Sequence, residues 1–78
     1  MASNETQADF VEKVVTLAVQ EGRKFQPGVM FEVRIPASLI PEGLSFTDIR
    51  GAVEAKASRS KLVTMGSDNW TYRFFRQE

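Results

Sequence analysis

The hydrophobic pattern of this chain changes its period at Ser60, and this change constrains the fold more than any other feature. Before it, apolar residues recur at the spacing of one face of an amphipathic helix. After it, residues 61–65 and 70–75 form two β-rich runs around the turn cluster Gly-Ser-Asp-Asn. The stretch 43–75 therefore predicts a helix over 46–60 followed directly by a β-hairpin. The apolar stripe of this helix consists of Phe46, Ile49, Val53 and Ala57, with Ser60 at its end.

The predicted helix carries a start signal. Ser45 and Asp48 have the S-x-x-D spacing of a capping box. In that motif the serine hydroxyl accepts a hydrogen bond from the amide three residues later, and the acidic side chain reaches back to the serine amide. We therefore expect the helix to begin near Phe46.

The outer face of this helix is unusual because most of its side chains are small. Gly51 in a helix interior costs about 1 kcal/mol relative to Ala, so close approach of another surface would explain it. One interpretation is that the face lies against DNA or a protein partner. The alternative is that it packs under another element of the same chain, or that Gly51 is simply tolerated. The face consists of Thr47, Asp48, Gly51, Ala55, Ser58 and Arg59.

The second strand of the hairpin alternates between two faces. Trp70, Tyr72 and Phe74 share one face and are expected to close the core over the helix, since a short domain needs its large apolar side chains inside. Arg73 lies on the other face, with its neighbours Thr71 and Phe75. The alternative is an exposed aromatic platform on which single-stranded nucleic acid stacks.

An N-terminal helix is predicted over 8–21, with Asn4 or Thr6 as its cap. Its apolar residues cover a wide arc of the helix surface, which favours either a central helix touched by several elements or a homodimer contact. Gly22 is expected to end the helix in the left-handed conformation, with cations following it at the negative helix end. The homodimer contact would use Val11, Val15 and Val19.

A strand is predicted over 29–35, where apolar and polar residues alternate. Pro36 ends its hydrogen-bond ladder, and residues 37–40 allow one short helical turn. We expect Leu39 and Ile40 to fill the core.

Composition excludes several classes of protein. Seventy-eight residues allow a single domain over 1–78, with 1–7 and 76–78 expected to be loose ends. The chain has no Cys and no His, so disulfides, Cys/His zinc sites and Ser-His or Cys-His catalysis are excluded. No phosphate-binding glycine loop and no paired carboxylates at a recognisable spacing are present. We therefore expect no enzyme activity, no cofactor, no metal and no membrane partner, and a cytoplasmic location by default.

Charge is distributed unevenly along the chain. Ten basic and ten acidic side chains cancel. Residues 1–42 carry four basic and six acidic side chains, and residues 43–78 carry six basic and four acidic ones. Any attraction to nucleic acid must therefore come from local clustering of cations in the C-terminal half.

The expected order of helix, strand, short turn, helix and β-hairpin resembles the winged helix-turn-helix family. The run LSFTDIRGAVEAKASRSKLV, followed by GSDN and WTYRF, is similar to that family's recognition helix, wing and closing strand. The resemblance is one of pattern over residues 8–75. It implies a small α+β domain with a three-stranded antiparallel sheet. It also implies base or backbone contacts on the outer face of the helix, and phosphate contacts at the hairpin.

Two functions remain open from the sequence. The first is a small non-enzymatic regulatory domain that binds DNA or a transcription-associated partner through the helix 46–60 and the hairpin 61–75. The second is a protein-interaction module, a small regulator or inhibitor that docks on a larger protein without binding nucleic acid. The candidate binding residues are Thr47, Gly51, Ala55, Ser58, Arg59, Lys61, Asn69 and Arg73.

Overall fold

The computed structural model describes residues 4–77 and contains two long helices and a three-stranded antiparallel sheet. The predicted α+β fold class and the predicted order of elements are confirmed. The elements are α1 (Asn4–Gly22), β1 (Phe31–Arg34), the 3-10 turn η1 (Ala37–Leu39), α2 (Phe46–Arg59), β2 (Leu62–Asp68) and β3 (Thr71–Arg76).

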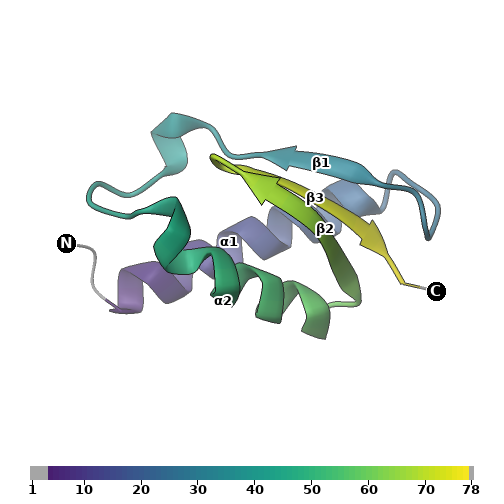
Figure 1. Ribbon diagram of the computed structural model, residues 1–78, viewed down its shortest axis with the longest axis horizontal. Coiled ribbons are helices and arrows are strands. Elements are labelled where there is room, and N and C mark those ends of the chain that lie inside the picture. Colours follow the sequence, from purple (N-terminus) through teal and green to yellow (C-terminus); the bar gives the residue numbers. More distant parts are fainter. Residues whose placement is uncertain (1–3, 78) are drawn as a thin grey trace.

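The sheet has the strand order β1-β3-β2, so β3 is central and both other strands are edges. The helices α1 and α2 run side by side in the same direction under one face of the sheet (Figure 1). α1 contacts β1 and β3, and α2 contacts β2. No described helix covers the opposite face of the sheet. The molecule is therefore a two-layer structure with an outer helix surface and an open sheet surface.

The core lies between these two layers. Tyr72 and Phe74 of β3 are fully buried, and they pack over the predicted apolar stripe of α2. Ile49, Val53 and Ala57 of that stripe are buried as expected, whereas Ser60 is exposed after the helix end and does not belong to it. An aromatic platform for single-stranded nucleic acid is excluded, because Tyr72 and Phe74 have no exposed ring face.

The N-terminal helix is longer than predicted. α1 begins at Asn4, so residues 4–7 are not a loose end and Thr6 lies inside the helix, not at a cap. Val11 and Val15 are buried in the core at 6% and 3% exposure, and Val19 packs against it partly buried. The predicted dimer contact through these valines is therefore wrong. The wide apolar arc of α1 is instead explained by the alternative interpretation, a central helix that contacts both the sheet and α2.

The prediction that Gly22 is left-handed is wrong. Gly22 is the last residue of α1, and its φ is not positive. Its role is spatial. A Cβ built on Gly22 would lie 2.9 Å from Cζ of Phe31. The glycine thus lets the ring of Phe31 pack against the end of α1, where it also stacks on Phe25 with ring centres 5.6 Å apart.

The first strand is shorter than predicted. Val29 and Met30 are 45% and 51% exposed and precede β1, so only Phe31, Val33 and Ile35 contribute to the core. The η1 turn forms where the sequence allows it, but Leu39 is 53% exposed and does not fill the core as expected. Ile40 packs against the core partly buried.

The hairpin turn lies later than predicted. Asn69 and Trp70 have φ values of 44° and 68°, as in a two-residue type I′ turn, and Gly66 to Asp68 belong to β2. Trp70 is consequently in the turn and not on a strand. Its ring packs edge-on against Phe10 and Phe46, which fastens the hairpin tip to both helices. At the far end Arg76 is part of β3, so the predicted C-terminal loose end is wrong for this residue.

Ser45 occupies the N-cap position of α2, as predicted, with extended φ and ψ of −94° and 141°. The predicted capping box does not form, because the Ser45 side chain makes no cap hydrogen bond. Its hydroxyl instead shares a hydrogen bond of 2.8 Å with the hydroxyl of Thr47. The start of α2 is thus set by the backbone and by the burial of Ile49.

The hydroxyl of Tyr72 has no hydrogen-bond partner in the described structure, and burial raises the pKa of Tyr72 to about 12. Because the pKa in the folded protein lies above its unfolded value of 10.0, the tyrosine contributes its full stability below about pH 10 and loses it as pH rises towards 12. We expect the free energy of unfolding to fall by about 2 kcal/mol more in the natural protein than in Tyr72→Phe between about pH 9 and pH 12. Urea unfolding of both proteins across this range measures the difference, and identical pH dependence would contradict it.

Candidate binding surface

The outer face of α2 is open to solvent. Its candidate residues Thr47, Gly51, Ala55, Ser58 and Arg59 are all exposed. A Cβ built on Gly51 would meet no atom within 4 Å. The interpretation that this small-residue face packs under another element of the chain is therefore wrong for the described residues. The face is a surface of α2 that a partner can approach closely.

The two helical glycines should respond in opposite directions to alanine. Gly51→Ala is expected to stabilise the protein by about 1 kcal/mol, because the space is open and alanine has the higher helix propensity. Gly22→Ala is expected to destabilise it by about 1–3 kcal/mol, because the new methyl group would overlap the ring of Phe31. Thermal unfolding of the two variants measures both changes. A loss of stability in Gly51→Ala would mean that the glycine is required by the fold.

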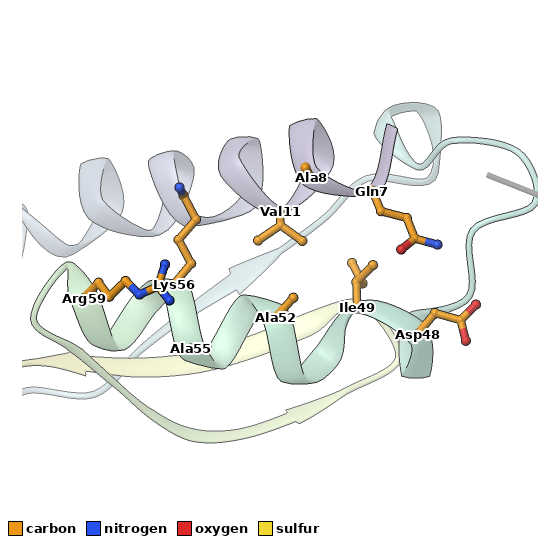
Figure 2. Close-up of a pocket in the computed structure, with 9 residues that line it drawn as sticks. All are labelled: Gln7, Ala8, Val11, Asp48, Ile49, Ala52, Ala55, Lys56 and Arg59. Carbon is orange, nitrogen blue, oxygen red and sulfur yellow. The ribbon is translucent and has the colours of Figure 1, made fainter. Parts of the chain in front are cut away.

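A groove of about 410 Å³ separates the outer sides of α1 and α2. Its middle is apolar and small, with Ala8 and Val11 on α1 facing Ala52 and Ala55 on α2 (Figure 2). Charged side chains mark its two ends. Asp48 lies at the end where α2 begins, and Lys56 and Arg59 lie towards the end of the helix, with Lys56 extending from α2 towards α1 (Figure 2).

Cations gather where α1 and α2 end together. Lys56 also lines a second hollow of about 230 Å³, which it shares with Arg23 at the end of α1. Arg59 lies on the last turn of α2, and Lys61 directly precedes β2. None of these four side chains forms an ion pair with another described residue, whereas Lys24 is paired with Glu21 at 3.1 Å. We call Arg23, Lys56, Arg59 and Lys61 the basic end.

Arg23 and Lys56 were missed as binding residues in the sequence. Arg23 was interpreted only as a cation at the negative end of a helix, a role that its position after Gly22 still allows. Lys56 lies on the flank of α2 that faces α1, outside the small-residue face. No single-element pattern joins the two residues, because their proximity depends on how the helices pack.

Two predicted site residues lie elsewhere. Arg73 is on the open face of the sheet, opposite the helices, where its Nε is 3.4 Å from a carboxylate oxygen of Glu32. Asn69 is exposed at the hairpin tip, next to Trp70. The structure therefore brings Arg59 and Lys61 together with the outer face of α2, but separates Arg73 from them by the thickness of the molecule.

The described residues show no arrangement that is typical of a metal site. They contain no group of three or more acidic side chains that could hold a metal ion. They also include no helix that combines the length and apolar character needed to cross a bilayer. Tyr72, whose pKa is raised by burial, is enclosed in the core. No protein-family model, curated protein or solved structure matches this chain.

Proposed function

We propose that this chain is a small, non-enzymatic, winged-helix-like regulatory domain that binds double-stranded DNA through the outer face of α2 and the basic end. The observation that carries the proposal is that none of the four cations forms an ion pair with another described residue, next to a helix face that is bare enough to approach a phosphate backbone closely. The order of the elements, with α2 leading into a β-hairpin, supports this use of α2.

Electrostatics favour one particular orientation. The net charge of the whole chain is zero, so attraction to DNA depends on a local cluster of cations such as the basic end. Asp48 and the acidic residues Glu5 and Asp9 lie where both helices begin, far along the helices from the basic end. A duplex would therefore contact the C-terminal half of α2 and avoid its first turn.

Titration of a labelled random-sequence duplex at about 50 mM and about 200 mM salt, followed by fluorescence anisotropy, tests the proposal. Neutralisation of four phosphates makes the logarithm of affinity fall with the logarithm of salt with a slope of about −3.6, which is a loss of more than a hundredfold over this range. Absence of binding at low salt would overturn the proposal.

The second candidate is a protein-interaction module that uses the same face. The apolar middle of the groove between α1 and α2 favours it, because Ala8, Val11, Ala52 and Ala55 would accept a partner's apolar side chain. Gly51→Arg and Ala55→Arg would obstruct such a partner without touching the core, since both positions are exposed. Loss of a captured protein partner in both variants, with no salt-sensitive DNA binding, would favour this candidate over the first.

A further inference from the structure

Within residues 4–77, β1 hydrogen-bonds only to β3 and lies at the border of the sheet, so its outer edge has no strand beside it there (Figure 1). The Ile35 amide donates to the Trp70 carbonyl at 2.9 Å, continuing the register that pairs Val33 with Tyr72. Successive residues of an antiparallel strand turn their amide and carbonyl groups to opposite sides. The backbone groups of Glu32 and Arg34 therefore point away from β3, towards the free edge.

A hollow of about 380 Å³ lies beside this edge on the helix side of the sheet. Val33 of β1 contributes to it, together with Leu17 of α1 and Leu39 of η1. The two leucines are 37% and 53% exposed and are among the large apolar side chains that the fold leaves uncovered. A strand added to β1 would place alternate side chains over this hollow while its backbone bonded to Glu32 and Arg34.

The two edges of the sheet differ. β2 is interrupted by a β-bulge, where the pairing shifts between Thr64 and Gly66. A bulge twists an edge and opposes further pairing. β1 pairs with β3 through four consecutive residues without a shift. β1 is therefore the edge of this sheet that can accept another strand.

The charges on β1 are complementary to those on β1 of a second copy of the chain, which makes that copy the best candidate for the added strand. In an antiparallel pair of β1 strands centred on Val33, Glu32 of each copy lies directly opposite Arg34 of the other. In this register the two residues of each pair can also hydrogen-bond through their backbones, since the amide and carbonyl groups of Glu32 and Arg34 both point towards the free edge. Opposite charges across such a pair are favourable, whereas registers that place Glu32 opposite Glu32 or Arg34 opposite Arg34 are disfavoured.

We propose that the chain forms a homodimer through antiparallel pairing of β1 with β1 of a second copy, which joins the two sheets into one. The two-fold axis is perpendicular to the sheet, so the helices of both copies remain on the same side. Leu17 and Leu39 of the two copies then cover the paired Val33 side chains. α2 packs against β2, the opposite edge strand, so its outer face stays free and the dimer would present two copies of the proposed DNA-binding helix.

Charge reversal at the edge tests the register as well as the dimer. Arg34→Glu gives each chain two acidic residues at the edge, and Glu32→Arg gives each chain two basic ones. We expect each variant alone to weaken self-association at least tenfold, because like charges then face each other in both pairs. An equimolar mixture of the two variants is expected to associate as a heterodimer, since every facing pair is again opposite in charge. Sedimentation equilibrium over a range of concentrations measures these masses against the 8.8 kDa chain.

Arg50→Glu is the matched control, because Arg50 is an exposed arginine on α2 that pairs with Glu54 and lies away from β1. It should leave association unchanged. Far-ultraviolet circular dichroism shows whether each variant stays folded. A natural protein that sediments as a monomer up to about 1 mM would overturn the proposal. A dimer that survives both reversals, or a mixture that stays monomeric, would overturn the β1 register.

Discussion

Phe74→Ala is expected to lower the free energy of unfolding by about 3–5 kcal/mol, the largest effect of any single substitution considered for this chain. Phe74 is fully buried at the centre of the sheet, with its ring centre 6.1 Å from that of Phe31 and 6.0 Å from that of Tyr72. Truncation would leave a cavity between these rings that neither helix can fill without moving. The total free energy of unfolding of a small domain is about 5–15 kcal/mol. The variant is therefore expected to unfold at a much lower urea concentration than the natural protein.

Met65→Ala is the control for this comparison. Met65 is 55% exposed at the bulge of β2, and surface truncations of this kind change stability by less than about 0.5 kcal/mol. Urea unfolding followed by the fluorescence of Trp70 reports on both variants, because Trp70 in the hairpin turn packs against Phe10 of α1 and Phe46 of α2. A loss below about 1 kcal/mol in Phe74→Ala would contradict the position of β3 at the centre of the core.

The elements that sequence predicted well are those in which local pattern and tertiary packing agree. The stripe of Ile49, Val53 and Ala57 has the period of a helix, and these residues are the ones that the sheet covers. The alternation of Tyr72 and Phe74 likewise matches a strand with one buried face. In both cases the same residues that set the local period also form the core, so no long-range information was needed.

The errors arose where a long-range contact decides the local structure. Gly22 looked like a left-handed cap, yet its role depends on Phe31, which approaches it from β1. Trp70 looked like a strand residue because of its size and its spacing from Tyr72. It lies in the turn with a positive φ, and its contacts with Phe10 and Phe46 are made across the hairpin tip. These contacts join segments that are far apart in sequence, so no window of the sequence contains them.

In the candidate site, too, the features set by local pattern could be predicted from the sequence and those set by long-range contacts could not. The small outer face of α2 followed from the helix period, but the basic end combines Arg23 of one helix end with Lys56 and Arg59 of another. The separation of Arg73 from these residues could have been deduced. Arg73 alternates with Tyr72, which packs on the helices, so its side chain had to lie on the far side of the sheet from α2.

Arg59→Ala combined with Lys61→Ala is expected to weaken binding to a DNA duplex by about a hundredfold at low salt. Hydrogen bonds to charged groups contribute about 1.5–3 kcal/mol each, and each 1.4 kcal/mol is about a factor of ten in affinity. Both side chains are exposed and form no ion pair with another described residue, so the fold does not depend on them. The salt dependence should also become shallower by about two units of slope, since two phosphate contacts are lost.

Arg73→Ala supplies the decisive comparison with Arg59→Ala, because each removes one positive charge and the two residues lie on opposite surfaces of the molecule. If DNA lies along the outer face of α2 and the basic end, this variant binds the duplex with the affinity and the salt slope of the natural protein. Arg23→Ala should instead weaken binding, since Arg23 shares a hollow with Lys56 at the basic end. If Arg73→Ala lost as much affinity as Arg59→Ala alone, the contact would involve the sheet face or would follow net charge alone. The surface assigned to α2 would then be wrong, even though the protein bound DNA.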